Sequence, residues 1–425
     1  MTPFRLEMNE EQALLERFLR YVQVDTQSDD DASCSPSTEK QKDLARLLVD
    51  ELKALGCADA AVDGWGYVTA TVPSRLPAGH PPVPVLGFLA HLDTYPSTPG
   101  GGVKPQVIRD YRGGDIPLAG TPEHPISRSD YPNLDRCLGH TLVTSDGTTL
   151  LGADDKAGIA EIMTMVAWLK AHPDFPHGTL RIGFTTDEEV GRGTEHFDVA
   201  AFGAAYAYTV DGAELGEIED ENFCADSATV AITGHDTHTG QAKGHMVNAL
   251  RIAASLIDRL PGDHLPETTE GRGSFLHPHH LSGSVAAAEI KFLVRAFTEE
   301  ELSRREADLQ RLAEEAERCF PGSRVRVQIQ PSYRNMALKV AEDPKVVDFA
   351  LEAIRRQDLT PLRRPIRGGT DGARLSYMGL LTPNLFTGAQ GYHSVHEWAS
   401  LAWMSASVEC CLQIVNVWRE KSAGY

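Results

Sequence analysis

Several apolar stretches of this sequence end in carboxylates. "LRIGF" is followed by "TTDEE", "AYAYTV" by a single aspartate, and "LLGA" by two more aspartates. Adjacent like charges repel each other, and the end of a buried strand does not require them. If the fold gathers these acids in one crevice, their repulsion predicts bound cations. The acids are Asp187, Glu188, Glu189, Asp211, Asp154 and Asp155.

Histidines stand in similar places. "GFLAHLD" ends in His91 and Asp93, and "GYHSVHEW" supplies His393, His396 and Glu397 in a late loop. Imidazole nitrogen combined with carboxylate oxygen suits zinc, manganese or cobalt. The seven cysteines are scattered and form no C-x-x-C pair, so neither a thiolate metal site nor a disulfide framework is expected. More carboxylates than one ion needs indicate two ions with a shared ligand.

Taken singly, each residue has an ordinary structural explanation. A strand-end aspartate commonly forms a turn or caps a helix. In combination the residues suggest distinct roles. Asp93 lies two positions after His91 on the same strand face and can accept the ring N–H that a metal does not use. Glu188 and Glu189 cannot point the same way in an extended chain, so one can bind a metal while the other faces substrate. Asp187 keeps the interpretation of a polar turn residue. The residues leave open whether Asp154 or Asp155 is the shared ligand.

The elements that would position these residues follow an α/β pattern. "VPVLGFLAHLD", "TLRIGFTTD" and "AYAYTVDG" are apolar runs of strand length, as expected for strands buried on both faces. They alternate with helical patterns such as "DDKAGIAEIMTMVAWLKAH", which predicts a mostly parallel sheet. "TEKQKDLARLLVDELKALG" predicts a helix with a capping box from Thr38 to Gln41 that ends at Gly56. Ligands of such sheets bind beyond the carboxyl ends of the strands.

A second pattern begins near Ala225. Strand-like and helical segments there predict an antiparallel sheet with helices on one face, a ferredoxin-like α+β domain. After "PSYRNM" the first pattern resumes. We therefore predict a discontinuous catalytic domain, residues 1–224 and 334–425, with an inserted lid or dimerisation domain, residues 225–333. The Gly- and Pro-rich stretch 95–125 predicts a long loop with a short hairpin.

Net charge and hydropathy limit the classes of binding partner. The net charge of −20 would repel a polyanion, so nucleic acid is not expected as a partner. No apolar run is long enough to span a bilayer, and the start of the chain has no signal-peptide pattern. We expect no membrane partner and a cytoplasmic location.

Long motifs resemble one known family. "HLDT", "DGTTLLGADDKAGIAEIM", "FTTDEEVGRG", "AKGHMVNAL", "PIRGGTDGARLSYMG" and "YHSVHE" look like peptidase T, the family of cytoplasmic tripeptide aminopeptidases of bacteria. This family belongs to the di-zinc exopeptidases, which also include carboxypeptidase G2 and several deacylases. The resemblance runs in order from the N-terminal helices to the last loop.

The resemblance implies a ligand set and a mechanism. Two zinc ions per subunit are implied, with manganese or cobalt as alternatives. Asp154 rather than Asp155 would bridge them, Asp93 would orient His91, and Glu188 would be the general base. The first zinc would be held by His91, Asp154 and Asp211, and the second by Asp154, Glu189 and His396.

The resemblance also implies substrate contacts. His238 would stabilise the oxyanion, from its own subunit or across a homodimer, although Thr239 follows it where the family usually has proline. A short peptide as substrate would present a free carboxylate to Arg367 or Arg295, and in the latter case Ala296 stands where the family has Asp. Further candidates for contact with the peptide backbone are Gly368, Gly369 and Asn384.

The leading hypothesis is a di-zinc aminopeptidase that acts on tripeptides. An N-acyl amino acid deacylase or amidohydrolase with the same metal site is the alternative enzyme. A metal-dependent peptide-binding protein without turnover is a third hypothesis. It ranks last, because it would need a broken base or ligand set, and here Glu188 and all five supposed ligands are present.

Overall fold

A computed structural model describes residues 3–422, which form two compact units. The first unit comprises the chain up to residue 220 together with 338–364 and the residues from 370 onward, and the second comprises 221–337 and 365–369. The predicted inserted domain, 225–333, falls within the second unit. The short segment 365–369, predicted as part of the catalytic domain, belongs to the second unit instead.

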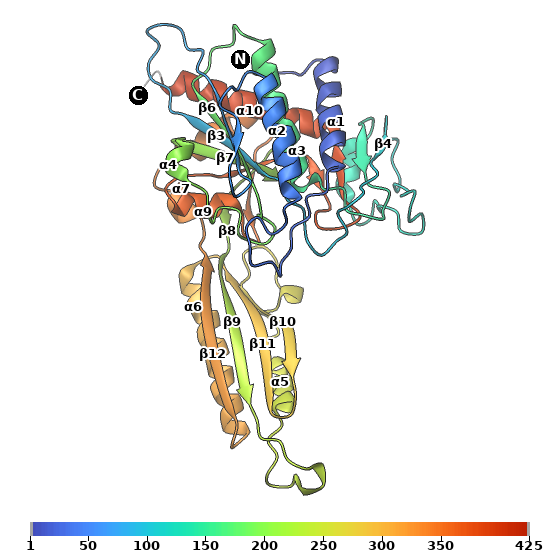
Figure 1. The fold of residues 1–425 in the computed structure, drawn as a ribbon, viewed down its shortest axis with the longest axis vertical. Coiled ribbons are helices and arrows are strands. Elements are labelled where there is room, and N and C mark those ends of the chain that lie inside the picture. The colour runs from blue at the N-terminus through green and yellow to red at the C-terminus, as the bar shows by residue number, and fades with distance from the viewer. Residues whose placement is uncertain (1–2, 423–425) are drawn as a thin grey trace. The chain divides into compact units, whose positions relative to one another are not determined.

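The large sheet is parallel at its centre. Its strand order is β1-β2-β6-β3-β7-β14-β8-β13, and Figure 1 labels β6, β3, β7 and β8 of this sheet. β6, β3, β7 and β14 pair in parallel, while β1, β2 and β8 add antiparallel partners at the flanks. All residues of β3 are buried, as its continuous apolar sequence predicts. The strands are β1 Ala61–Val62, β2 Val68–Val72, β3 Leu86–His91, β6 Leu180–Thr185, β7 Tyr206–Gly212, β8 Glu217–Asn222, β13 Leu362–Ile366 and β14 Asn384–Phe386.

Helices cover both faces of this sheet. Phe88 and Tyr208 stack on each other, and Tyr208 bonds to residues of α8 and α10. Leu89 and Ala207 point to the opposite face, where they contact residues of α4 and α9. The α/β class is therefore confirmed. The helices are α1 Met8–Val22, α2 Gln41–Ala54, α3 Ala153–Ala171, α4 Val199–Phe202, α7 Ala337–Val340, α8 Lys345–Arg356, α9 Asp371–Tyr377 and α10 Leu401–Ser422.

Helix α3 is central, because it packs on β3 and β7 and is itself covered by α1 and α10. Helix α2 begins at Gln41 with Lys40 as its N-cap, so the predicted capping box is wrong. The hydroxyl of Thr38 instead donates to the carbonyl of Gln27, at 2.7 Å. Within residues 3–422, no helix is long and apolar enough to cross a membrane.

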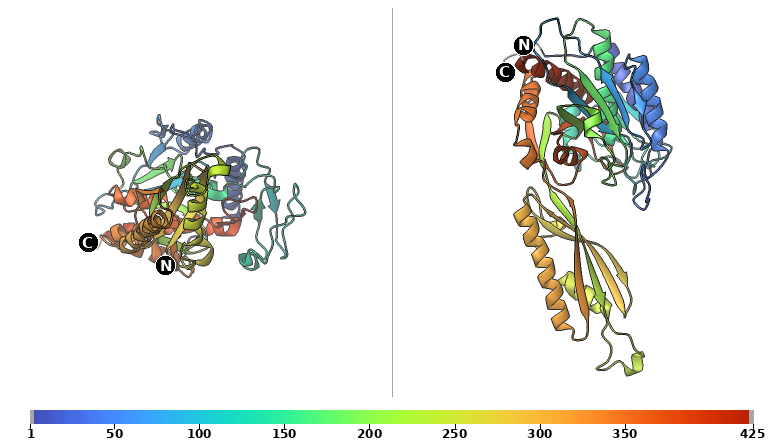
Figure 2. Two further views of the ribbon diagram at one scale, coloured as in Figure 1. Left: turned by 90° about the horizontal axis from the view of Figure 1, so that it is seen from below. Right: turned by 60° about the vertical axis from the view of Figure 1, so that its left-hand side comes forward.

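The second unit is an antiparallel sheet with the strand order β10-β11-β9-β12, whose strands are labelled in Figure 1 and seen from another side in Figure 2 (right). Its elements follow the order βαββαβ, which confirms the ferredoxin-like prediction. They are β9 Cys224–Thr233, α5 Ala249–Asp258, β10 Phe275–Gly283, β11 Ala287–Ala296, α6 Glu299–Cys319 and β12 Arg324–Tyr333. Short 3-10 turns are Pro132–Cys137 in the first unit and Thr239–Gln241 and Pro266–Thr268 in the second.

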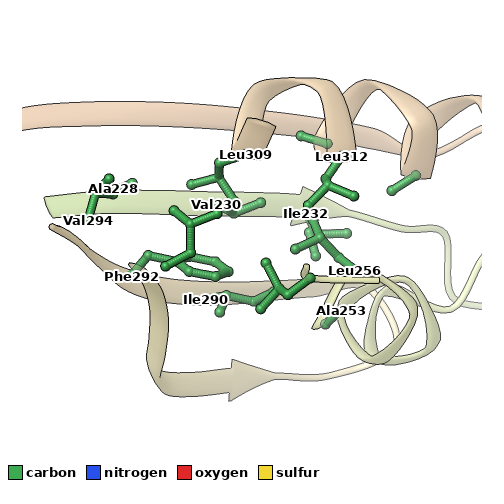
Figure 3. Packing of buried hydrophobic residues seen from close by; sticks show 14 of the residues in the cluster. Ala228, Val230, Ile232, Ala253, Leu256, Ile290, Phe292, Val294, Leu309 and Leu312 are labelled. Atoms are coloured by element: carbon green, nitrogen blue, oxygen red, sulfur yellow. The ribbon is translucent and has the colours of Figure 1, made fainter. Parts of the chain in front are cut away.

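One face of this smaller sheet carries the core of the second unit. Val230 of β9 and Phe292 of β11 pack against Leu256 of α5 and Leu309 of α6 (Figure 3). Side chains two apart on a strand share a face, so the same alternation places Ala228, Ile232, Ile290 and Val294 in this core. Both helices therefore lie on one side of the sheet.

The predicted loop 95–125 is more ordered than its composition suggests. It supplies β4, the edge of a third sheet with the order β15-β16-β5-β4. Tyr111, Ile116 and Leu118 pack with Trp398 and Trp403 in a separate small core. Strands of two or three residues are too short to show a period in sequence, which is why most of this sheet escaped prediction. They are β4 Gln106–Ile108, β5 Leu142–Thr144, β15 Ala389–Gln390 and β16 Trp398–Ser400.

Candidate metal centre

Strand ends bring most of the acidic cluster together. His91 is the last residue of β3, and Asp211 lies one position before the end of β7. Glu188 and Glu189 follow β6. Because β6, β3 and β7 are parallel neighbours, their carboxyl ends meet at one edge of the sheet. Asp154 comes from the first turn of α3, which packs on β3 and β7.

The first group of possible ligands is His91, Asp154 and Asp211, named here the His91 triad. Nε2 of His91 lies 2.9 Å from Oδ1 of Asp154 and 3.6 Å from Oδ1 of Asp211. The His91 side chain is only 3% exposed. Its Nδ1 lies 3.0 Å from the backbone carbonyl oxygen of Asp93. That carbonyl can only accept, so Nδ1 carries a proton and Nε2 is the ring nitrogen left for a metal.

Asp93 does more than the sequence predicted. Its carbonyl, rather than its carboxylate, accepts the closest contact from His91, and the carboxylate is 3.5 Å from Nδ1. The buried carboxylate of Asp93 also accepts hydrogen bonds from the backbone N–H groups of Glu188, at 3.0 Å, and Glu189, at 3.1 Å. Asp93 therefore fixes the end of β3 to the loop that presents both glutamates.

The second group is Asp154, Glu189 and His393, named here the His393 triad. Nε2 of His393 lies 3.1 Å from Oδ2 of Asp154 and 2.9 Å from Oε2 of Glu189. Asp154 thus belongs to both triads and turns one oxygen toward each. Oε1 of Glu189 is buried and has no hydrogen-bond partner within residues 3–422. An orphaned carboxylate oxygen at this place fits a bound cation.

The structure differs from the predicted ligand set at one residue. The resemblance assigned His396, but the structure brings His393 to Asp154 and Glu189. Nε2 of His396 instead lies 3.2 Å from the carbonyl oxygen of His124. Both histidines lie in the turn between β15 and β16, where neither a helical nor a strand period determines which ring faces the sheet. His393 has a positive φ of 62°, which turns the chain sharply at this position.

The two remaining acids, Asp155 and Asp187, accept hydrogen bonds that hold the segments around the site in place. Asp155 is buried and accepts hydrogen bonds from the backbone of His91 and Gly158, each at 3.2 Å. Asp187 does occupy a turn, with φ of 61°, but it is also fully buried. Its carboxylate accepts from the Ser37 hydroxyl at 2.6 Å and from Nε2 of Gln41 at 2.7 Å. Asp187 therefore ties the loop after β6 to the start of α2.

Burial makes this cluster electrostatically costly without a cation. Removal from water raises the pKa of Glu189 to about 8 and that of Asp211 to about 7, and it raises the pKa of Glu188 well above its usual range. Burial opposes the charged imidazole of His393, but Asp154 and Glu189 outweigh it and raise the pKa of His393 to about 11. The apo cluster therefore retains protons near neutral pH, and divalent cations can replace them.

The donor set suits two transition-metal ions. Each triad offers one imidazole nitrogen and two carboxylate oxygens, and the three ligand atoms lie within 4.8 Å of one another. This combination without thiolate suits zinc, manganese or cobalt. Within residues 3–422, these two triads are the groups of histidine, cysteine and acidic side chains with such spacing. The shared Asp154 makes the arrangement a candidate dinuclear centre.

Two predicted substrate ligands, Arg367 and Arg295, already have partners inside the second unit. The terminal nitrogens of Arg367 donate to the carbonyls of Gly271, at 2.7 Å, and Gly273, at 3.1 Å, and to Thr269. In this structure the predicted contact of Arg367 with a substrate carboxylate would compete with those bonds. Nη1 of Arg295 donates to the carbonyl oxygen of Asp226 at 3.0 Å.

The other residues of the second unit that were predicted to contact the peptide or the oxyanion differ in their surroundings. A Cβ at Gly369 would lie 2.8 Å from the ring of Tyr333, so internal packing already requires glycine there. A Cβ at Gly368 would meet no atom nearer than 3.9 Å, and the predicted approach of a peptide stays a prediction. His238 is exposed, and its Nδ1 accepts the backbone N–H of Gly240 at 3.2 Å. Its role at the oxyanion also stays a prediction.

Asn384 is not placed to contact a peptide. Its side chain is 2% exposed, and Oδ1 accepts the backbone N–H of Asp211 at 3.0 Å. Nδ2 donates to the carboxylate of Glu219 at 2.6 Å. Because both ends of the amide are used inside the sheet, Asn384 holds the backbone of Asp211 rather than a substrate.

Two buried acids near the site were not assigned a role from sequence. Asp371 begins α9 and accepts the hydroxyl of Thr185 at 2.7 Å. A Cβ at Gly193 would lie 2.1 Å from Oδ1 of Asp371, so glycine lets the loop after β6 pass over this carboxylate. Glu397 accepts the backbone N–H of Gly152 at 2.5 Å, just before α3. Neither contact has a spacing signal in the sequence, because each joins distant segments.

Comparison with known proteins places the chain in a family. The model of peptidase family M20/M25/M40 matches residues 142–417. Over 412 residues the chain is 45% identical to the peptidase T of Geobacillus thermodenitrificans strain NG80-2, which covers 97% of this chain and 100% of that relative. The chain belongs to the peptidase T family.

Solved structures share the fold of this peptidase T family member. Aminopeptidase PepT from Bacillus cereus ATCC 10987 superposes with a TM-score of 0.74 at 24% identity, covering 96% of this chain and 98% of the other. A tripeptidase from Staphylococcus aureus subsp. aureus Mu50 superposes with a TM-score of 0.77 at 23% identity, covering 96% and 99%. The match extends over both units, so the inserted domain belongs to the shared fold.

Proposed function

We propose that this chain is a dinuclear metallo-aminopeptidase that releases the N-terminal residue of tripeptides, with two zinc ions per subunit. The observation that carries this proposal is the pair of triads joined by Asp154, with Glu188 next to the ligand Glu189. The names of the relatives supply the substrate class: the curated relative is a peptidase T, and one structural neighbour is a tripeptidase.

The residues divide the chemistry between them. The His91 triad and the His393 triad would hold the ions, which when bound polarise the scissile carbonyl and lower the pKa of water. Glu188 takes a proton from the attacking water and delivers it to the leaving amine. Its backbone N–H is held by Asp93, so its position is fixed relative to His91. His238 is proposed to donate to the developing oxyanion.

The remaining predictions concern location and assembly. We expect a cytoplasmic enzyme, as the resemblance to the cytoplasmic tripeptide aminopeptidases implies. A homodimer is also expected from the resemblance. In such a dimer His238 would act either in its own subunit or at the site of the partner. Sedimentation analysis of the purified protein measures the assembly directly.

The decisive experiment is metal analysis combined with a peptide panel. We expect two ions per chain, cleavage of tripeptides in preference to di- and tetrapeptides, and loss of activity on chelation. An N-acylated tripeptide in the same panel separates the hypotheses: cleavage of the blocked peptide but not the free one would favour the deacylase. Tripeptide cleavage that survives complete removal of metal would refute the proposal.

A further inference from the structure

The two histidines of the metal centre differ in how they are held. His91 is 3% exposed and sits at the end of a buried strand, whereas the side chain of His393 is 45% exposed in a turn. An exposed imidazole has several rotamers to lose when it is fixed toward a metal. A contact on another side of the ring would lower the cost of holding Nε2 toward Asp154 and Glu189.

The turn after β3, residues 94–98, provides that contact. The ring of Tyr95 is stacked on the imidazole of His393, with centroids 4.2 Å apart and planes only 4° from parallel. The hydroxyl of Thr98 donates to the backbone carbonyl of His393 at 2.7 Å. A face-to-face contact restrains the plane of the imidazole but leaves its nitrogens, which lie on the ring edge, available to carboxylates or a metal.

The turn of residues 94–98 is itself held in place by hydrogen bonds from Gln27. Nε2 of Gln27 donates to the carbonyls of Pro96, at 2.8 Å, and Thr98, at 2.7 Å. Gln27 also pairs with Thr94 in a β-bridge. The turn continues directly from the strand that ends in His91, so the segment that presents one histidine also supports the other.

From this geometry we propose that Tyr95 is a positioning residue for His393. Its stacked ring sets the affinity of the His393 triad for a metal ion and leaves the His91 triad unaffected. The inference rests on the dinuclear centre proposed above and adds a residue that carries no ligand atom. Residues that orient metal ligands typically change metal affinity by about 10- to 100-fold when they are removed.

The test is a zinc titration against a chromophoric chelator, which resolves two affinities per chain. In Tyr95→Ala we expect one of the two sites to weaken by about ten-fold or more while the other keeps its affinity. Tyr95→Phe keeps the ring and should restore the wild-type value, whereas Tyr95→Leu keeps bulk without the ring and should not. Tyr377→Ala, which removes an exposed tyrosine at the end of α9, is the matched control and should leave both sites unchanged.

A second variant identifies which site responds. His393→Ala should lose the ion of the His393 triad, and Tyr95→Ala in that background should have no further effect on the remaining site. Equal weakening of both sites in Tyr95→Ala, or unchanged affinities, would overturn the proposal. A wild-type chain that binds fewer than two ions would instead refute the dinuclear centre, so the two failures are distinguishable.

Discussion

The His91 triad and the His393 triad share Asp154 but are built by different means. The His91 triad comes from two parallel strands and the helix packed on them, and its histidine is buried. The His393 triad takes Glu189 from the loop after β6 and its histidine from the turn between β15 and β16. Secondary structure therefore determines one half of the centre, and tertiary contacts between loops determine the other.

This difference has a physical consequence. The ligands of the His91 triad are held by the sheet, whose opening requires global unfolding, whereas loops are drawn from the less stable part of a structure. Asp93 reduces the difference, because its carboxylate ties the loop of Glu188 and Glu189 to β3. The His393 turn depends on the stack with Tyr95 instead.

The largest effect is expected where the two triads meet. Asp154→Ala removes one ligand from each triad, so both ions should be lost or strongly weakened. Tripeptide kcat/KM should fall on the order of 10⁴-fold or more, because the carbonyl and the water are then no longer activated. Metal content and kinetics measure the two effects separately. Retention of both ions would show that Asp154 is not shared.

Glu188 belongs to neither triad, and its replacement should separate chemistry from metal binding. Glu188→Gln should keep two ions per chain while kcat falls by about 10²- to 10⁴-fold, the usual contribution of a general base. Glu195→Gln, an exposed glutamate on the same loop, is the control and should keep full activity. Full activity in Glu188→Gln would require a different base.

The sequence predicted the strand-borne half of the site because strand periods restrict side-chain direction. An apolar run ending in His91 and another ending in Asp211 could be aligned from the parallel topology alone. Asn384 was misassigned for a related reason. It was expected in contact with substrate, and only the pairing of β14 with β7 and β8 shows that both ends of its amide are used.

The loop-borne half could not be predicted in the same way. His393 and His396 are three residues apart in a turn, where no periodicity distinguishes them, and the resemblance led to the wrong one for this geometry. The stack of Tyr95 and the contact of Asp371 with Thr185 join segments far apart in sequence. The fold of both units was accessible because apolar periodicity extends over whole elements.

The two candidate histidines can be compared directly. His393→Ala should remove one ion and lower kcat/KM by about 100-fold, as for loss of an ordinary ligand or its orienting group. His396→Ala should keep both ions, because the ring of His396 contacts the carbonyl of His124 instead. Metal analysis of both variants under identical dialysis is the measurement. The reverse result would restore the ligand set predicted from sequence.

The smallest expected effect is a dependence of zinc affinity on pH. Both triads should show it, although their histidines differ in exposure. Neighbouring carboxylates raise the pKa of His393 to about 11 and that of His91 well above its usual range, so each imidazole is protonated in the apo protein at neutral pH. A metal can bind only the deprotonated nitrogen, so each ion must displace at least the proton of its imidazole. Apparent zinc affinity should therefore rise with pH, by about ten-fold per unit for each proton displaced. Calorimetric titration in two buffers of different ionisation enthalpy counts the protons released. If only one triad released a proton, the exposure of His393 would outweigh its carboxylate neighbours, and the electrostatic equivalence of the two triads would be wrong.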